Sequence, residues 1–330
     1  MHKKNILSGI QSTGNLTLGN YLGAITNFIK MQEQFNCYYM IADLHSLTIR
    51  NNPEELKSNI LKVIALYLAA GLDPKKSAIF IQSHVPEHTQ LSWILNCYTY
   101  MGELSRMTQY KDKSIKHADN INSGLFTYPV LMASDILLYQ ANLVPVGEDQ
   151  RQHLEITRDI AERFNKIYGK TFSIPEAYIP KTGAKIMGLQ NPTSKMSKSS
   201  TIPNDTILLI DTPDEIIKKI KKAKTDSDNI VKYDIQNKPG VSNLLSIYSI
   251  ITNKSIQELE NEFLQMTYGE FKKIVAEAII EELRPLQLRY NEIINDEKYL
   301  KEVYTSGAEK ASITANKTLK DVYEKIGLVI

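Results

Sequence analysis

The chain has 330 residues, of which 42% are hydrophobic and 23% charged, and a formal net charge of +2. This balance excludes a disordered or fibrous chain, is typical of a globular protein long enough for two domains, and does not by itself indicate nucleic-acid binding. No apolar stretch approaches the roughly 18 residues of a transmembrane helix, and no signal-peptide core follows Met1, so we expect a cytoplasmic protein.

Residues 1–204 alternate between strand and helix patterns. Short apolar runs predict buried strands at 6–10, 37–42, 78–81 and 143–146, and amphipathic stretches predict helices at 21–34, from 53 onward, at 91–101 and at 150–168. This alternation predicts an α/β domain, a Rossmann-like parallel sheet wound by helices, with ligands at the carboxyl ends of the strands. Cys37 and Cys97 form no CxxC pair, and we expect both to be buried thiols.

Helical patterns dominate from residue 205 to 330, which predicts an all-helical second domain. Thr212 and Ser255 each precede a Glu three residues later, the signature of a helix start, and further helices are expected at 268–293 and 308–326. One predicted helix carries a band of five lysines, Lys218, Lys219, Lys221, Lys222 and Lys224. Such a band fits either a solvated helix face or a phosphate-binding surface.

Two glycine-containing turns follow predicted strands. Gly14 and Gly19 follow the first strand, and Gly19 opens a helix whose free N–H groups and dipole face a ligand above the sheet. Gly147-Glu148-Asp149-Gln150 follows the fourth strand, where an acidic side chain can accept from ribose hydroxyls. Alone, the first turn is also compatible with a structural connector, and the acidic residues of the second with ordinary charge at a helix N-terminus. The chain has neither GxGxxG nor a P-loop pattern, which argues against a dehydrogenase and a P-loop ATPase.

A third segment, Lys195-Met196-Ser197-Lys198-Ser199, places two ammonium groups and two hydroxyls within five residues of a turn-rich stretch. These groups suit the binding of polyphosphate oxygens. By itself the segment is equally compatible with a solvated surface loop. Its meaning depends on whether the other two turns complete a nucleotide site.

Together these segments resemble the bacterial tryptophanyl-tRNA synthetases, a subgroup of the class I aminoacyl-tRNA synthetases, over essentially the whole chain. Thr17-Leu18-Gly19-Asn20 stands in the place of the family's HIGH motif, with Thr17 and Asn20 replacing both histidines, and residues 195–199 match KMSKS in full. Further segments resemble the family in order and spacing: Ser8–Gln11, Gly102–Leu104, Arg106–Gln109, Leu131–Ala133, Asp135–Tyr139 and Val144–Gln150.

The resemblance implies a set of site residues. For the chemistry it implies Lys195, Lys198, Ser199, Thr17 and Asn20. For ATP it implies Gln11, Ser12, Thr13, Gly19, Asn20, Gly147, Glu148, Asp149, Ile186, Lys195, Met196, Ser197, Lys198 and Ser199, with Lys113 as an extra contact. For the amino acid it implies Asp135, Tyr128, Met132, Gln150, Leu7 and, more weakly, His45, which also fits an ordinary loop histidine. We expect Mg²⁺ to enter with ATP and no structural metal.

Asp135 and Leu7 bear on substrate choice. Asp135 lies in a mostly apolar predicted helix, where an unpaired carboxylate would be costly, so it needs a donor. It could be a helix cap; the resemblance implies instead that it accepts the indole N–H, a donor-only group. The related tyrosyl-tRNA synthetases place a Tyr on the first strand where this chain has Leu7, and an apolar side chain cannot pair a phenol.

The implied function is that of a tryptophan–tRNA ligase, which makes tryptophanyl-adenylate and pyrophosphate from tryptophan and ATP and passes the acyl group to the 3′ end of tRNA(Trp). The resemblance also implies a homodimer and a tRNA-binding role for residues 205–330. Alternatives are a tyrosyl-tRNA synthetase, a small-molecule nucleotidyltransferase and a non-catalytic RNA-binding paralogue. A paralogue of that kind usually loses ligand contacts, whereas both loop lysines and Asp135 are present here.

Overall fold

The computed structural model describes residues 3–116, 120–147, 150–178, 185–197 and 200–329. Its strands form one parallel sheet in the order β3-β2-β1-β4-β5, which confirms the predicted fold class. The strands are β1 (Asn5–Gln11), β2 (Asn36–Ala42), β3 (Ser77–Ile81), β4 (Leu143–Pro145) and β5 (Glu176–Tyr178). The strand order reverses between β1 and β4, and their carboxyl ends therefore flank a crevice.

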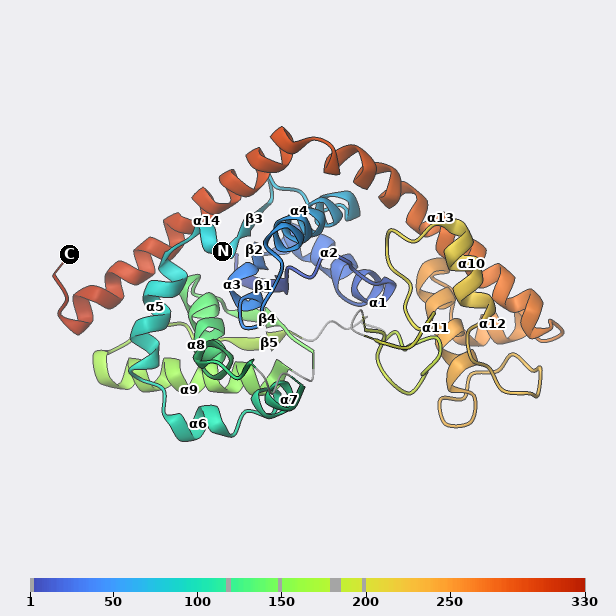
Figure 1. Cartoon of the computed structure of the whole chain (residues 1–330), viewed down its shortest axis with the longest axis horizontal. Coiled ribbons are helices and arrows are strands. Elements are labelled where there is room, and N and C mark those ends of the chain that lie inside the picture. The colour runs from blue at the N-terminus through green and yellow to red at the C-terminus, as the bar shows by residue number, and fades with distance from the viewer. Residues whose placement is uncertain (1–2, 117–119, 148–149, 179–184, 198–199, 330) are drawn as a thin grey trace.

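Helices and short helical turns connect the strands (Figure 1). They are α1 (Leu18–Asn20), a π-helical turn (Tyr21–Ile25), α2 (Thr26–Gln34), α3 (Asp43–Ser46), α4 (Pro53–Ala70), a 3-10 turn (Gln82–His84), α5 (Glu87–Asn96), α6 (Met101–Ser105), α7 (Thr108–Lys116), α8 (Ser123–Leu138) and α9 (Arg151–Tyr168). The helical stretch expected to start at Tyr21 begins three residues earlier, because Thr17 and Asn20 form a capping box.

The helix predicted at 91–101 was placed wrongly. α5 starts at Glu87, directly after Pro86, and ends at Asn96, and α6 starts separately at Met101. Glu87 and His88 are polar but buried, so the apolar pattern did not include the first turn of α5. Cys37 is buried as expected, whereas Cys97 follows the last turn of α5 and is exposed, so the prediction was wrong for Cys97.

Residues 205–329 are largely helical, as expected. The helices are α10 (Pro213–Lys221), α11 (Pro239–Thr252), α12 (Ile256–Glu262), α13 (Tyr268–Ile294) and α14 (Glu297–Ile326). Thr212 and Ser255 form the predicted capping boxes. The last helix begins at Glu297 rather than at residue 308, because the Asp296 side chain accepts from the backbone N–H of Tyr299 and caps it.

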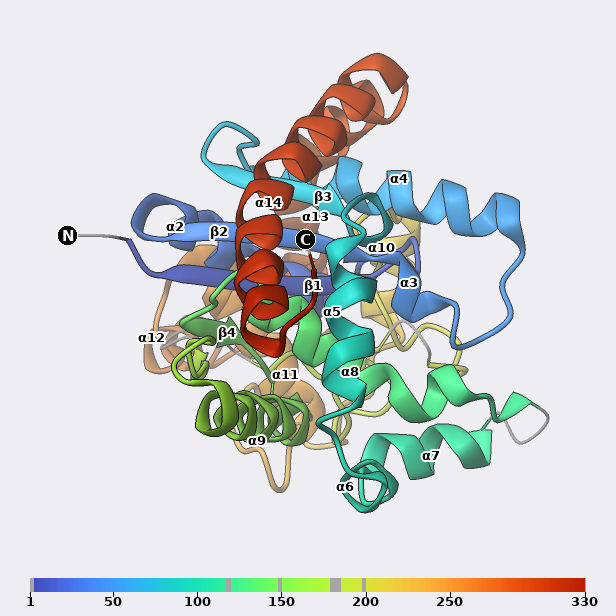
Figure 2. The same ribbon diagram turned by 90° about the vertical axis from the view of Figure 1, so that its left-hand side faces the viewer.

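The two long C-terminal helices join the helical group to the sheet. Figures 1 and 2 show α13 leading away from α10–α12 and α14 running back across the sheet at β3. The fit is close: a Cβ added to Gly307 of α14 would lie 1.9 Å from the carbonyl oxygen of Ile79 in β3. The C-terminal helix therefore packs directly on a strand of the α/β sheet.

The sheet separates two hydrophobic cores. Ile6 of β1 belongs to a core that continues into the helical region, and Leu7 faces the core formed with α5, α8, α9 and α14. The alternation along β1 follows from the two-residue side-chain period of a strand. None of the described helices is both long and apolar enough to cross a membrane.

Candidate functional site

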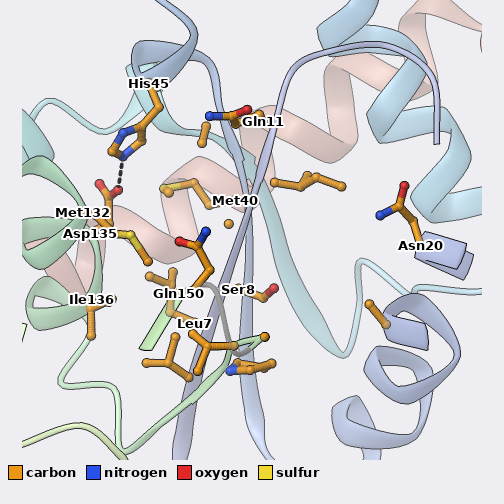
Figure 3. Close-up of a pocket in the computed structure, with 18 of the residues that line it drawn as sticks. Leu7, Ser8, Gln11, Asn20, Met40, His45, Met132, Asp135, Ile136 and Gln150 are labelled. Carbon is orange, nitrogen blue, oxygen red and sulfur yellow. Dashed lines mark hydrogen bonds and ion pairs between the residues drawn. The ribbon is translucent and has the colours of Figure 1, made fainter. Parts of the chain in front are cut away.

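A cavity of about 530 Å³ lies at the carboxyl ends of β1, β2 and β4, where the strand order predicts a ligand site. It brings together residues from ten helices, helical turns and strands and from several loops. The predicted site residues that line it are Leu7, Gln11, Asn20, Tyr128, Met132, Asp135, His45, Gly147, Gln150 and Lys195. Figure 3 shows His45, Met132 and Asp135 on one side of this cavity and Asn20 on the opposite side.

Asp135 is the buried anion of the site. It is 1% exposed on α8, and His45 Nε2 lies 2.7 Å from its Oδ2 (Figure 3). His45 belongs to the short helix α3 directly after β2 and lines the cavity, so it is not an ordinary loop histidine. Burial alone would raise the pKa of the Asp135 carboxyl, but His45 and His88 outweigh burial and lower the pKa to about 2. Asp135 is therefore ionised.

Two partners of Asp135 were missed by sequence analysis. Gln82 Nε2 donates to Asp135 Oδ1 over 2.7 Å, and His88 Nδ1 lies 2.6 Å from the same oxygen. Both follow β3, Gln82 immediately, and both are fully buried. The rule that ligands gather at strand ends applies to β3 as well and would have pointed to them.

The other residues predicted to bind the amino acid surround Asp135 with both apolar and polar groups. Leu7 is buried on β1 and contributes an apolar wall together with Met132. The Tyr128 hydroxyl lies 2.8 Å from His153 Nε2, and burial raises the pKa of this phenol above its ordinary value. Gln150 lines the cavity just beyond β4. The arrangement suits a flat aromatic ligand with one polar edge.

The opposite side of the cavity is formed by the turn after β1. Thr17 is buried, and its hydroxyl accepts from the Asn20 N–H and donates to Asn20 Oδ1. Thr17 thus fixes the turn, while Asn20 lines the cavity. Gly14 has a φ of 76°, which favours glycine, and Ser12 is buried with its hydroxyl 2.8 Å from that of Ser46. Thr13 is exposed in the same turn.

Ile186 and Met196 lie beneath Gly19. A Cβ at Gly19 would come within 3.5 Å of both side chains, which are buried, and the Met196 N–H donates to the Ile186 carbonyl. This contact joins the described part of the predicted loop, residues 195–197, to the start of α1. Lys195 is exposed and lines the cavity, and Ser197 is exposed beside it.

Asp205 closes the base of that loop and was not predicted. This buried carboxylate accepts from the backbone N–H groups of Gln190 and Asn191 before the loop and from the Ser200 hydroxyl after it, over 2.8 to 3.0 Å. One side chain therefore joins the two ends of the loop. Glu148, Asp149, Lys198 and Ser199 lie outside the described residues, as does the side chain of Lys113.

The described residues contain no cluster of three or more His, Cys, Asp or Glu arranged to hold a metal ion. The described cavity lining offers amide groups, backbone and a lysine on the side of Asn20. These groups fit phosphate oxygens, and a divalent cation accompanying a nucleotide would be bound mainly through those oxygens.

The pattern that defines the tRNA synthetases class I (W and Y) matches residues 2–284. The chain belongs to this family. A tryptophan–tRNA ligase of Clostridium tetani (strain Massachusetts / E88) is 55% identical over 329 residues, which cover 100% of this chain and 97% of that protein.

Two solved structures resemble the chain closely. The tryptophanyl-tRNA synthetase of Mycoplasma pneumoniae is 37% identical, with a TM-score of 0.89 over 99% of this chain and 98% of that one. The enzyme from Campylobacter jejuni, complexed with ADP and tryptophan, is also 37% identical, with a TM-score of 0.85 over 98% and 100%. Both likenesses extend through the helical region.

Proposed function

We infer that the chain is a tryptophan–tRNA ligase that activates L-tryptophan with ATP and transfers it to tRNA(Trp). The observation that carries this inference is one cavity with an ionised, buried Asp135 on one side and Asn20 and Lys195 available to a nucleotide. The 55% identical relative and the complex of a 37% identical relative with ADP and tryptophan support the same substrates.

Asp135 selects the amino acid. Indole has one N–H donor and no acceptor, so a carboxylate is its natural complement. A phenol would leave its oxygen facing apolar Leu7 and Met132, and an unpaired buried polar group weakens binding strongly. We therefore propose tryptophan rather than tyrosine as the substrate.

The other side of the cavity holds ATP. We propose that Gln11, Gly19, Asn20 and Gly147 contact the nucleotide, with Ser12, Thr13, Glu148, Asp149 and Ile186 completing its surroundings. Backbone N–H groups at the start of α1 suit phosphate oxygens. Mg²⁺ entering with ATP neutralises phosphate charge.

The first step needs positioning more than acid–base chemistry. The tryptophan carboxylate attacks the α-phosphorus of ATP, a bond forms between them, and pyrophosphate leaves. We propose that Lys195 and Lys198 stabilise the charge that grows on the leaving pyrophosphate, with Ser197, Ser199, Met196 and Lys113 supporting them. In the second step the 2′-hydroxyl of the tRNA's terminal adenosine takes the acyl group and AMP leaves.

Residues 205–330 are proposed to bind the tRNA, with a boundary to the catalytic part near residue 204. Lys218, Lys221 and Lys222 are exposed along and after α10, whereas Lys219 pairs with Asp211 over 2.5 Å. Free ammonium groups on one helix suit a phosphate backbone.

We also propose that the enzyme acts in the cytoplasm, where its tRNA substrate is used.

We propose a homodimer whose interface includes α5 and α6. Trp93, Tyr100 and Met101 are 73%, 63% and 71% exposed within nine residues of chain. Large apolar side chains exposed together mark interaction surfaces. Light scattering on the purified protein gives its mass in solution: a dimeric mass that falls to the monomer in Trp93→Glu supports this interface, and a monomeric wild type contradicts it.

ATP–pyrophosphate exchange with each proteinogenic amino acid in turn, with and without Mg²⁺, tests the proposed function. We expect Mg²⁺-dependent exchange with tryptophan that exceeds exchange with tyrosine or phenylalanine by about 10⁴ or more. Exchange with tyrosine alone would show that tyrosine, and not tryptophan, is the substrate. No exchange with any amino acid, while the protein binds tRNA, would indicate a non-catalytic paralogue.

A further inference from the structure

The Asp135 carboxylate is held asymmetrically by its neighbours. Oδ1 receives Gln82 Nε2 at 2.7 Å and His88 Nδ1 at 2.6 Å, whereas Oδ2 receives only His45 Nε2, at 2.7 Å, among the hydrogen bonds of the described residues. Each carboxylate oxygen accepts about two hydrogen bonds. Oδ1 is therefore saturated, and Oδ2 keeps one acceptor position beside the cavity.

His88 can donate to Asp135 because Tyr139 fixes the position of its ring proton. The Tyr139 hydroxyl lies 2.7 Å from His88 Nε2, and both residues are fully buried. Burial, and after it the charge of Asp135, raises the pKa of Tyr139 well above its ordinary value, so the phenol keeps its proton. A hydroxyl that donates to Nε2 leaves the proton of a neutral imidazole on Nδ1, which faces Asp135.

The surrounding contacts hold this chain of groups in place. The Ser134 hydroxyl donates to the His88 carbonyl over 2.7 Å, which joins α5 to the helix that carries Asp135. The ring of Tyr38 stacks on Tyr139 with centroids 4.5 Å apart, and the Tyr38 hydroxyl lies 2.9 Å from that of Thr314 in α14. Few alternative rotamers are open to side chains packed in this way.

We propose that Gln82 and His88, with Tyr139 behind His88, are positioning residues that determine amino-acid specificity. By filling Oδ1 they make Asp135 present a single acceptor, Oδ2, to the cavity. The ligand class that matches it is an aromatic amino acid whose ring edge carries one N–H donor. This inference rests on the proposed function and adds to it: none of the three residues lines the cavity, and they act only through Asp135.

The test compares L-tryptophan with L-3-benzothienylalanine, which has the same shape but sulfur in place of the ring N–H. The measurement is kcat/KM in ATP–pyrophosphate exchange for both amino acids. The variants are His88→Ala, His88→Asn, which keeps a donor at the Nδ1 position, and Tyr139→Phe, which keeps the ring. Tyr268→Phe is the matched control, because its buried hydroxyl also lies beside an aspartate, Asp226, but in the helical region.

We expect His88→Ala to reduce the ratio of the two kcat/KM values by about 10- to 100-fold, the effect of losing a hydrogen bond to a charged group, through the KM for tryptophan and not the KM for ATP. Tyr139→Phe should reduce it by several-fold, and His88→Asn should restore part of it. Tyr268→Phe should leave the ratio unchanged even if it lowers the melting temperature.

A merely structural role would lower exchange with both amino acids equally and leave the ratio unchanged. That result in Tyr139→Phe and His88→Asn, with folding confirmed by circular dichroism, would overturn the proposal while the proposed function stands. A wild type that activates neither amino acid would instead contradict the proposed function. Failure of His88→Ala to fold leaves the two milder variants to decide the outcome.

Discussion

The two sides of the cavity are built in opposite ways. Around Asp135 the polar groups are buried and already bonded to one another, with His45, Gln82 and His88 arranged on one carboxylate. On the other side, Lys195 and Ser197 are exposed. The segment that carries them is held at its two ends by hydrogen bonds to Asp205. On one side the polar groups pair with one another, and on the other they are exposed to a ligand.

This difference matches the two tasks of the enzyme. Selecting an amino acid requires a fixed pattern of donors and acceptors, because discrimination depends on leaving the wrong group unpaired. Stabilising a leaving pyrophosphate requires charge that becomes effective in the transition state. The comparison therefore predicts that changes near Asp135 alter tryptophan binding and that changes near Lys195 alter the rate.

The largest effect is expected at the loop. Lys195→Ala should lower kcat for tryptophan-dependent pyrophosphate exchange by about 10²- to 10³-fold, because a group that stabilises transition-state charge is lost, and Lys198→Ala should act in the same way. The dissociation constant for tryptophan, measured by calorimetry, should not change. Lys57→Ala, an exposed lysine on α4, is the control. Equal exchange rates in the Lys195 variant and the wild type would show that Lys195 takes no part in adenylate formation.

Asp135→Asn should have the next largest effect, on binding. An amide in place of the carboxylate keeps the shape but loses the charge that three donors surround, at a cost of about 2–3 kcal/mol, or roughly 30- to 150-fold in the KM for tryptophan. Exchange assays with tryptophan, tyrosine and phenylalanine measure the change. Unchanged discrimination among the three would show that selection occurs elsewhere in the cavity.

Acid should lower the stability of the fold through Asp135. The folded pKa of Asp135, about 2, lies below its ordinary value of 3.8, so its ionisation stabilises the fold above pH 4 and this contribution is lost as the pH falls toward 2. The loss is about 2 kcal/mol at most. Urea unfolding between pH 5 and pH 2 measures it. The pH dependence should be weaker in Asp135→Asn, and an identical slope in both proteins would contradict the pKa assignment.

Asp205→Ala should give the smallest of the four effects. Removing the carboxylate frees both ends of the loop, and we expect kcat to fall about 10-fold with the KM for tryptophan unchanged, as for a positioning residue that acts through the loop. Asp234→Ala is the matched control, since Asp234 also accepts two backbone N–H groups but lies in the helical region. A rise in the KM for tryptophan without a change in kcat would show that Asp205 acts on amino-acid binding, as the groups around Asp135 do.

The sequence predicts the sheet and the position of the site, and it does so for local reasons. Uniform apolar runs identify buried strands, and Thr212 and Ser255 identify helix starts because a capping box is made within four residues. β5 was not predicted, since its three residues are not fully buried and form no apolar run. The helix predicted at 91–101 was misplaced because its first turn is polar but buried.

Two of the partners of Asp135, Gln82 and His88, leave no such local pattern, and only their place after β3 points to them. Gln82 and His88 lie 53 and 47 residues before Asp135 in the sequence, and only the packing of α5 and the end of β3 against α8 brings them together. Asp205 likewise acquires its role from a turn that closes around it. Side chains that act on one another across the fold leave no periodic signal. The side of the cavity around Asp135 was therefore predicted without Gln82 and His88, although Leu7, His45, Tyr128, Met132 and Gln150 were included.

A crystal structure of the protein with L-tryptophan and a non-hydrolysable ATP analogue tests the division of the cavity most directly. We expect the indole nitrogen about 3 Å from Asp135 Oδ2, a normal hydrogen-bond distance, with Gln82 and His88 still on Oδ1 and the β- and γ-phosphates beside Lys195. An indole nitrogen turned toward Leu7, or an Asp135 carboxylate rotated away from His88, would contradict it.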